Sequence, residues 1–138
     1  MNREQEKIGR ETEKEVAKYL KELRYYALII PKTVHGQPVD MIFGKNNIVW
    51  FVDIKHLENN KASFPFDRIE SNQETAMQYA KIISNMTNLG FVIKWERDDS
   101  GYFFLDYDKF LELRKNGFKS VKMKDLKRFD EVLNERSN

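Results

Sequence analysis

The stretch Val39–His56, VDMIFGKNNIVWFVDIKH, decides the fold because it joins two apolar segments through a polar turn. VDMIF and IVWFVDIK flank the residues Gly44–Asn47, whose composition is typical of a turn, so we predict a hairpin with a four-residue loop. IVWFV is continuously apolar, which indicates a strand covered on both faces and central in its sheet. Asp40, Asp53 and Lys55 interrupt these apolar segments. Burying an unpaired charge is costly, so each of the three needs a partner or a task.

The rest of the chain alternates helical and strand patterns, without an internal repeat, a linker or a low-complexity segment. Apolar residues recur with helical spacing over residues 3–24, which predicts an amphipathic helix. The further elements that we predict in chain order are a strand over 25–30 ended by Pro31, an irregular connection over 58–66, a helix from the capping box Ser71–Glu74 to about Asn88, a hairpin of FVIKWE and YFFL around Asp98–Gly101, a helix capped by Asp106 or Asp108 that runs to about Lys115 before Gly117, the short strand KSV, and a last helix from about Lys124. This order predicts a single α/β domain over residues 1–138, with a central mixed β-sheet flanked by helices.

Composition bounds the cellular setting and excludes several chemistries. With 138 residues, 13% of them aromatic, the chain is long enough for one domain with a packed core. It contains no cysteine, which excludes disulfides, cysteine-ligated zinc and thiol nucleophiles and suits a reducing cytoplasm. Residues 1–16 hold no apolar segment of a signal peptide, and no apolar run approaches the roughly 18 residues of a membrane-spanning helix. We therefore expect a cytoplasmic protein that is neither secreted nor membrane-spanning.

The predicted hairpin brings three charged side chains to one end of the sheet. Pairing Phe43 with Ile48 across the loop places Asp40 diagonal to Asp53, and strand alternation puts Lys55 on the same face. Two carboxylates at that separation repel each other unless a cation bridges them or one of them binds a proton. Hard divalent cations suit oxygen ligands, and Mg²⁺ is the usual one when phosphate is another ligand. The pattern thus favours a metal site beside a phosphate.

A lysine next to such a site can orient or deprotonate a water, or stabilise the anionic transition state of phosphodiester hydrolysis. Lys55 would have this position. Spacing alone also fits a simpler arrangement, in which Asp53 and Lys55 form a salt bridge at the edge of the sheet and Asp40 lies in a turn. The residues by themselves leave both arrangements open.

Two further polar residues lie near the predicted apolar faces of helices. Glu13 is roughly 80° from the centre of the apolar stripe of the first helix, on a margin that faces the sheet, and Glu15 has a similar offset on the other margin. Gln73 shares a helical face with Met77 and Ala80, so it either satisfies a backbone group in the first turn or points into a site. Helical periodicity decides neither question.

The positive charge of the chain is concentrated near its C-terminal end. The net charge is only +2, but residues 109–128 contain eight basic side chains against two acidic ones. The basic residues of this block are Lys109, Arg114, Lys115, Lys119, Lys122, Lys124, Lys127 and Arg128. Such a block is a candidate surface for an anionic partner, and an ordinary solvated face is the alternative.

Several motifs together resemble a known family. Gly9-x-x-x-Glu13-x-Glu15-Val16, followed by Asp40 and by Asp53-Ile54-Lys55, is similar to the PD-(D/E)xK nuclease superfamily and within it to Holliday junction resolvases. ASFPF, a helix opened by Gln73, FVIKW, YFFLDYDKF and KNGFKSVKMKDL resemble the RecU-type resolvases most. The resemblance covers about residues 9–127. It implies a restriction-endonuclease-like fold for the chain.

The resemblance also implies roles for individual residues. It assigns Glu13, Asp40 and Asp53 as metal ligands, Lys55 as the catalytic lysine, and Gln73 as the polar residue that leads from the helix into the site. The implied cofactor is Mg²⁺, for which Mn²⁺ can substitute. The implied reaction is hydrolysis of DNA that leaves a 5′-phosphate and a 3′-hydroxyl.

The chain departs from RecU-type proteins between Pro31 and Asp40, where those proteins carry a long stalk and this sequence has only a short segment. Lys32, Thr33 and Gln37 of this segment remain close enough to the metal site to contact DNA. We expect the other DNA contacts from Arg114, Lys115, Lys119, Lys122 and Lys124 of the basic block. Because this segment is short, we expect any difference from RecU-type proteins to lie in the choice of DNA substrate and not in the chemistry.

The leading hypothesis is therefore a Mg²⁺-dependent, structure-selective endonuclease that resolves four-way junctions. Because paired nicks on opposed strands need two sites, we expect a homodimer, with YYALII or YFFL in its interface. The alternatives are a restriction-like, flap or single-strand nuclease on the same core, or a catalytically silent DNA-binding module. His35 and His56 carry no assigned role, and the side chain of His56 should point to the sheet face opposite Lys55.

Overall fold

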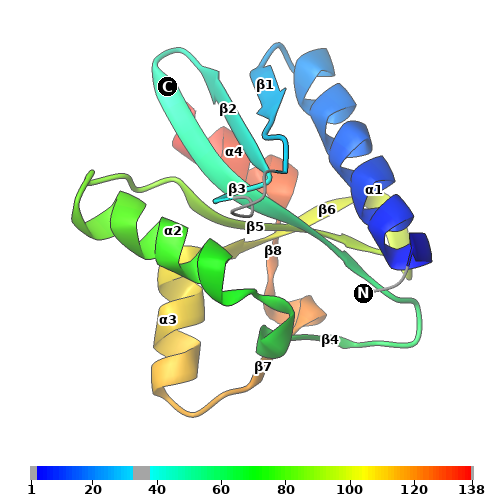
Figure 1. Cartoon of the computed structure of the whole chain (residues 1–138). Helices are drawn as coiled ribbons and strands as arrows, with labels where there is room; N and C mark the ends of the chain where they lie inside the picture. Colours follow the sequence, from blue (N-terminus) through cyan, green and yellow to red (C-terminus); the bar gives the residue numbers. More distant parts are fainter. Residues whose placement is uncertain (1–2, 33–37, 138) are drawn as a thin grey trace.

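The computed structural model describes residues 3–32 and 38–137, and over these residues a six-stranded mixed sheet lies between helices (Figure 1). In chain order the elements are α1 (Arg3–Glu22), β1 (Tyr26–Ile29), β2 (Met41–Lys45), β3 (Ile48–Leu57), β4 (Ser63–Pro65), the 3₁₀ turn η1 (Phe66–Arg68), α2 (Ser71–Ile82), β5 (Leu89–Trp95), β6 (Asp98–Asp106), α3 (Tyr107–Lys115), β7 (Ser120–Lys122), the 3₁₀ turn η2 (Met123–Asp125), β8 (Lys127–Arg128) and α4 (Phe129–Arg136). The strand order of the main sheet is β1-β2-β3-β5-β6-β8, and β4 pairs with β7 in a small second sheet.

The predicted fold class is confirmed, because this is an α/β domain with a central mixed sheet flanked by helices. Strand β3 lies between β2 and β5, as its continuous apolar sequence predicted. It pairs antiparallel with β2 and parallel with β5, and α2 makes the crossover between the two parallel strands.

The register of the β2–β3 hairpin differs from the predicted one. Phe43 pairs with Trp50 and not with Ile48, because the strands are joined by the two-residue turn Asn46-Asn47 and not by a four-residue loop. Both asparagines have positive φ, 54° and 67°, as the tight turns that match strand twist require. The shift is two residues, so every side chain keeps its predicted face.

Three other boundaries were also predicted wrongly, and the connection expected to be irregular over 58–66 contains strand β4. Helix α2 ends at Ile82 and not near Asn88, since the chain turns at Ile83 and Asn85 takes a positive φ of 55°. The β5–β6 hairpin turns at residues 96–97 and not at 98–101. The last helix begins at Phe129, after η2 and β8, and not near Lys124. In the α3 region, Asp106 is the N-cap, and its side chain accepts a hydrogen bond from the backbone of Asp108 at 2.9 Å.

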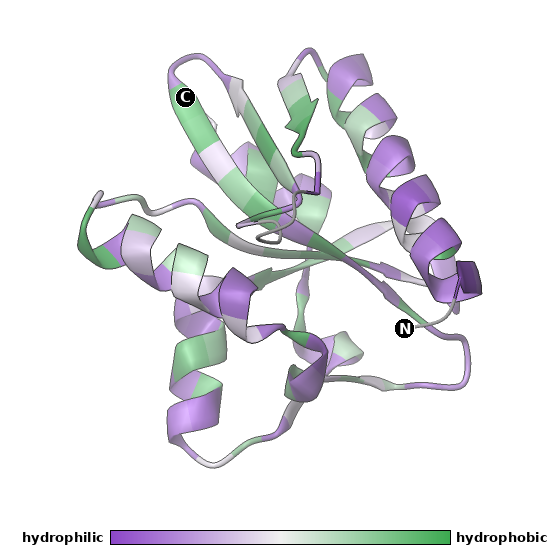
Figure 2. Ribbon diagram, in the orientation of Figure 1, coloured by the Kyte–Doolittle hydropathy of each residue, from purple (hydrophilic) through white to green (hydrophobic). Residues whose placement is uncertain are grey.

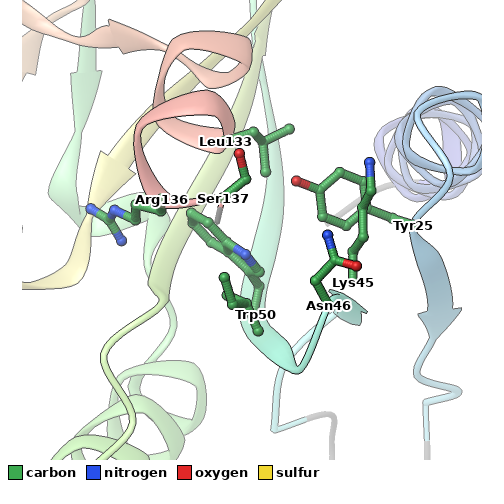
Figure 3. Close-up of a pocket in the computed structure, with 8 residues that line it drawn as sticks. Tyr25, Lys45, Asn46, Trp50, Leu133, Arg136 and Ser137 are labelled. Carbon is green, nitrogen blue, oxygen red and sulfur yellow. The ribbon is translucent and has the colours of Figure 1, made fainter.

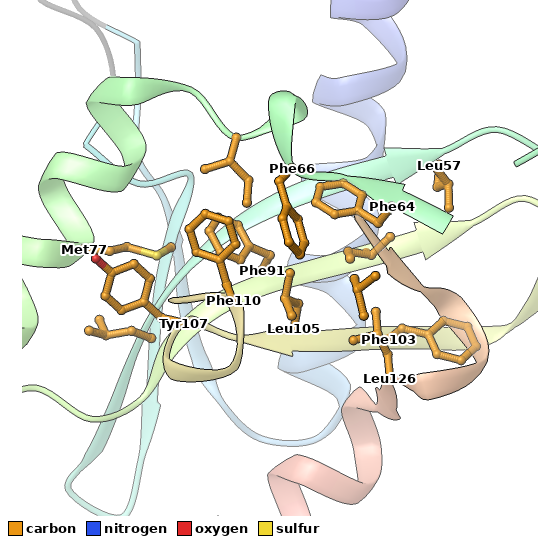
Figure 4. Packing of buried hydrophobic residues seen from close by; sticks show 14 of the residues in the cluster. Leu57, Phe64, Phe66, Met77, Phe91, Phe103, Leu105, Tyr107, Phe110 and Leu126 are labelled. Atoms are coloured by element: carbon orange, nitrogen blue, oxygen red, sulfur yellow. The ribbon is translucent and has the colours of Figure 1, made fainter. Parts of the chain in front are cut away.

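Each face of the sheet has its own apolar core. On one face α1 and α4 pack on an aromatic group in which Trp50 stacks on Phe43 with ring centroids 5.4 Å apart and Phe129 contacts Phe43 edge-on at 5.9 Å. On the other face α2, α3 and the β4–β7 ribbon enclose a second cluster around Phe91 and Phe110 (Figure 4). In Figure 2 the central strands are largely green, with purple segments in the C-terminal part of β3, whereas α1 is mostly hydrophilic outside its buried stripe. Within the described ranges, no helix has the length and apolar character that crossing a membrane would need.

Candidate functional site

Asp40 and Asp53 lie side by side, and each side chain accepts a hydrogen bond from a backbone amide of the other's segment. The amide of Asp40 donates to Oδ1 of Asp53 at 3.1 Å, and the amide of Ile54 donates to Oδ2 of Asp40 at 2.7 Å. Both side chains are buried, and Asp53 is fully so. The β2–β3 pairing ends at Met41 and Val52, and beyond it side-chain carboxylates take the place of backbone carbonyls as acceptors. The structure thus places the two aspartates next to each other.

Asp53 has one side-chain oxygen that no described residue satisfies. Its Oδ2 is buried and has no hydrogen-bond partner among the described residues. Burial raises the pKa of Asp53 well above its usual range, and the Asp40 carboxylate raises it further, against the smaller opposing effect of Lys55. Burial also raises the pKa of Asp40, against the Ile54 hydrogen bond and Lys55. A buried carboxylate pair of this kind is stable when ionised only if a cation compensates it.

Lys55 is the buried cation of the site, and two neutral acceptors fix its ammonium group. Nζ donates to the carbonyl oxygen of Arg68 at 2.9 Å and to Oε1 of Gln73 at 2.8 Å. Burial lowers the pKa of Lys55, and the charges of Asp53 and Asp40 act in the opposite direction. The structure does not show the edge salt bridge between Asp53 and Lys55 that spacing alone allowed, because the contacts of Nζ are to uncharged oxygens.

Gln73 joins the first turn of α2 to the site. It is buried together with Met77 and Ala80, which confirms their shared helical face. Its Oε1 accepts from Lys55 and also from the backbone amide of Glu70 at 3.3 Å. The N-cap is therefore Glu70 and not Ser71, and Gln73 has both of the roles that the sequence left open.

A cleft of about 710 Å³ opens over these residues, lined by α1 on one side and by η1 and the start of α2 on the other. Glu13 lies on the α1 wall of this cleft. Burial raises the pKa of Glu13 to about 7, with a further contribution from Asp40. Glu15 is engaged elsewhere, since it pairs with Lys94 at 2.7 Å and accepts from the hydroxyl of Tyr102 at 3.2 Å.

The remaining predicted site residues are only partly brought together. Lys32 lines the cleft, whereas Thr33 and Gln37 lie outside the described residues. Arg114 forms an ion pair with Glu74 of α2. Four other lysines of the block are exposed on α3, on the turn that follows it, on β7 and on η2, and none of them lines the cleft: Lys115, Lys119, Lys122 and Lys124. The basic block is thus a surface beside the cleft and not a part of it.

Two cleft residues were missed by the sequence analysis. Arg10 lies one helical turn before Glu13 and lines the same cleft, so the spacing of three residues could have identified it. Arg68 donates from Nη2 to the carbonyl oxygen of His56 at 2.7 Å while its own carbonyl holds Lys55. No sequence signal marks Arg68, since its contact with Lys55 is made by the backbone. His56 pairs with Glu96 at 3.1 Å at the rim of the cleft.

The donor set fits a hard divalent cation. Within residues 3–32 and 38–137, no three side chains of His, Cys, Asp or Glu lie close enough to enclose a metal by themselves. Mg²⁺ is usually bound through one or two carboxylates and keeps several waters or substrate phosphates. Asp40 and Asp53, with the unpartnered Oδ2, match that mode of binding. Glu13 would then act through water and not as a direct ligand.

A second hollow, between the β2–β3 turn and the end of α4, is too small to compete with this cleft (Figure 3). Its volume is about 10 Å³, room for about one water. Its charged side chains cover aromatic rings, with the Arg136 guanidinium 5.2 Å from the Trp50 ring centroid and Lys45 Nζ 5.1 Å from that of Tyr25. We assign these contacts to packing.

Comparison with known proteins gives a fold and no sequence family. No family model matches the chain, and no curated protein is significantly similar to it in sequence. Its structure is similar to that of Hjc, a Holliday junction resolvase from the archaeal hyperthermophile Archaeoglobus fulgidus, with a TM-score of 0.64. The likeness covers 90% of this chain and 98% of that one at 12% sequence identity. The chain therefore has the α/β fold of that resolvase, which agrees with the predicted restriction-endonuclease-like fold.

Proposed function

We propose that this protein is a Mg²⁺-dependent, structure-selective DNA endonuclease, and that four-way junctions are its main substrate. The observation that carries the proposal is the buried, unpartnered Oδ2 of Asp53 next to Asp40, since Asp40 lines a cleft together with the fixed Lys55. The fold shared with an archaeal Holliday junction resolvase supports the same reading. The narrower resemblance to RecU-type resolvases remains a prediction from sequence motifs.

The proposed chemistry is hydrolysis at phosphorus, in which a water oxygen forms the new bond and the bond to the 3′ oxygen breaks. A bound Mg²⁺, held by Asp40 and Asp53, would polarise the phosphate and favour ionisation of water. Lys55 would stabilise the negative charge that develops on the phosphate, and its two neutral acceptors keep its ammonium in place for that task. Glu13, with a pKa of about 7, can hold or release a proton on the α1 wall near neutral pH.

Among the described residues, the cleft is lined by seven carboxylates and four basic side chains, and the basic ones offer contacts for a phosphate backbone. Arg10 and Lys32 add positive charge to the side of α1, and Arg68 adds it to the opposite wall. The exposed lysines on β7 and η2 extend this charge beyond the cleft. Contacts of this kind position DNA without reading its sequence. Selectivity would then come from the shape of the substrate.

We also propose a homodimer, because a two-fold assembly supplies two cleavage sites to a two-fold junction. Of the two strands predicted for the interface, YFFL is buried inside the domain, whereas Tyr26 and Leu28 on β1 are 78% and 49% exposed. Leu28 pairs with Ile42 on β2, and Ile42 pairs in turn with Phe51 on β3, so these three side chains share one face of the sheet. Helix α2 covers another part of the same face. Three apolar residues at the end of α2 are each more than 60% exposed, namely Tyr79, Ile82 and the C-cap residue Ile83. We call Tyr26, Leu28, Tyr79, Ile82 and Ile83 the apolar surface, and we propose a second copy of this chain as its partner.

The function is tested by offering the protein a four-way junction, a flap, a duplex and a single strand of matched sequence, each with Mg²⁺. We expect paired nicks in the junction at a higher rate than any cut in the duplex. If the flap or the single strand were cut faster than the junction, that DNA and not the junction would be the main substrate. Absence of cutting on all four, with DNA binding retained, would instead identify a silent binding module.

A further inference from the structure

Phe118 is an exposed aromatic residue outside the apolar surface. It lies on the turn between α3 and β7 and is 55% exposed. The other large apolar side chains exposed among the described residues lie on α2 or around the β1–β2–β3 end of the domain. A partner for the apolar surface would therefore not explain the exposure of Phe118.

The backbone of this turn is fixed by a helix-ending motif. The amide of Gly117 donates to the carbonyl oxygen of Arg114 at 3.0 Å, and the amide of Phe118 donates to that of Leu113 at 3.0 Å. Gly117 has a φ of 89°, which glycine adopts without strain. This is a Schellman motif, in which an apolar side chain at the position of Phe118 often packs back on the helix. Such packing accounts for only part of the ring here, because more than half of it remains exposed.

The sequence around Phe118 is rich in basic residues. Residues 113–124 contain five basic side chains and no acidic one. Arg114 is paired with Glu74, while Lys115 and Lys119 are exposed on either side of the aromatic residue. A cationic setting is unfavourable for an ordinary apolar protein interface, whose centre is depleted of charge. It suits a polyanion that also presents flat apolar faces.

This turn is continuous with the wall of the cleft. The carbonyl oxygen of Lys119 accepts a hydrogen bond from the amide of Phe66 at 2.9 Å, and Ser120 pairs with Pro65 across the β4–β7 ribbon. Phe66 begins η1, whose last residue Arg68 lines the cleft and holds Lys55. A strand that leaves the cleft over η1 would therefore reach Lys119 and Phe118 next.

We propose that Phe118, with Lys115 and Lys119, is a stacking site for an unpaired nucleotide of the DNA strand that leaves the cleft; this rests on the proposed function insofar as the ligand is DNA. Aromatic rings stack on any base, and neighbouring lysines neutralise the flanking phosphates. Bases inside a duplex have both faces covered, so only DNA with an unpaired base can use this site. The site would favour substrates with unpaired nucleotides next to the cut, such as open branch points and flaps.

The test measures binding without cleavage. Fluorescence anisotropy would compare a fluorescein-labelled oligothymidylate with a blunt duplex of the same length, both in Ca²⁺. Phe118→Leu keeps an apolar side chain and removes the aromatic face, whereas Phe118→Tyr keeps the face and is the matched control. Lys119→Gln is the charge control. We expect Phe118→Leu to weaken oligothymidylate binding about tenfold and to leave duplex binding unchanged. Phe118→Tyr should bind like the wild type, and Lys119→Gln should weaken both ligands.

Two results would overturn the inference. One is oligothymidylate binding by Phe118→Leu at the wild-type affinity. The other is an equal loss of affinity for oligothymidylate and duplex, because that would mean that the ring supports the turn and does not stack on a base. The proposed function fails separately. If the wild type cuts no DNA but oligothymidylate binding depends on the Phe118 ring, the nuclease proposal fails and the stacking site stands. If the wild type cuts junctions but oligothymidylate binding does not depend on the ring, the stacking site fails and the nuclease proposal stands.

Discussion

The ammonium of Lys55 and the side-chain amide of Gln73 meet between β3 and the start of α2, with Nζ 2.8 Å from Oε1. The two residues are 18 positions apart in the sequence, and both are buried. The same Oε1 accepts from the Glu70 amide, so the lysine is tied to the N-terminal turn of the helix. This contact makes α2 a support of the proposed site as well as a part of the core.

Replacing Gln73 by Leu should lower the cleavage rate without weakening DNA binding. The change removes one of the two acceptors of Lys55 and lets its ammonium move, which we expect to reduce kcat roughly 10- to 100-fold. Junction affinity measured in Ca²⁺ and KM should stay close to wild type. Gln78→Leu is the matched control, because Gln78 is exposed on the same helix. If Gln73→Leu lost affinity and rate together, Gln73 would contribute to DNA binding and not only to the position of the lysine.

Replacing Asp53 by Asn should stabilise the metal-free protein at pH 8. Burial and Asp40 raise the pKa of folded Asp53 above that of an unfolded aspartate, about 3.9, so the folded state binds more protons. The stability of the wild type is then fullest below pH 4 and falls as the pH rises through the folded pKa. Asn removes this loss and can still accept the hydrogen bond from Asp40. Thermal melts in a chelator between pH 5 and 8 would measure the difference.

In the same melts, Mg²⁺ should raise the melting temperature of the wild type and not that of Asp53→Asn. Each kcal/mol added to the free energy of unfolding should raise the melting temperature by roughly 3–6 °C for a chain of this size. Asp98→Asn is the control, since hydrogen bonds from Ser100 lower the pKa of Asp98 and its loss should not stabilise the protein. A wild type that is no less stable than Asp53→Asn at pH 8 would show that the aspartate pair is not strained without metal.

Much of this arrangement could be predicted from the sequence, because side-chain alternation fixes faces independently of exact register. The hairpin register was two residues off, yet Asp40, Asp53 and Lys55 still shared the predicted face. The error arose at Gly44, which resembles a turn residue but belongs to β2 while Asn46-Asn47 makes the turn. Element types were therefore easier to predict than the turns that connect them.

The parts that sequence could not give depend on contacts between distant segments. The apolar residues Ile82 and Ile83 continue a helical pattern past the true end of α2, since exposed apolar residues there mimic a buried stripe. The choice between Glu13 and Glu15 needed the position of Lys94 and Tyr102, which engage Glu15. The backbone carbonyl of Arg68 has no signature in the sequence at all.

Gly90→Ala should destabilise the protein through the β5–β6 contact. A Cβ added at Gly90 would lie 2.5 Å from the carbonyl oxygen of Leu105 and 2.5 Å from Cζ of Phe104. The strands would have to move apart, and overpacking of this kind costs about 1–3 kcal/mol or more. Urea unfolding would measure the loss. Gly9→Ala is the control, because nothing lies near its added Cβ and alanine favours a helix.

Ile82→Glu should convert the proposed dimer into a monomer. Ile82 is 63% exposed, so the change should leave the fold intact while placing a charge in the apolar surface. Sedimentation should show halved mass, and junction cleavage should give single nicks in place of paired ones. Phe118→Glu, with similar exposure outside the apolar surface, should leave the mass unchanged. A wild type that is monomeric with and without DNA would contradict the dimer.

The measurement that tests the account most directly is the rate of four-way junction cleavage in Mg²⁺ by the wild type, Asp53→Asn and Glu15→Gln. We predict cleavage by the wild type and by Glu15→Gln at similar rates, because Glu15 is held away from the cleft by Lys94 and Tyr102. Asp53→Asn should lose cleavage by orders of magnitude and still bind the junction in Ca²⁺, since it lacks the carboxylate that would hold the metal. Full cleavage by Asp53→Asn, or none by a folded wild type that binds the junction, would contradict the proposed site.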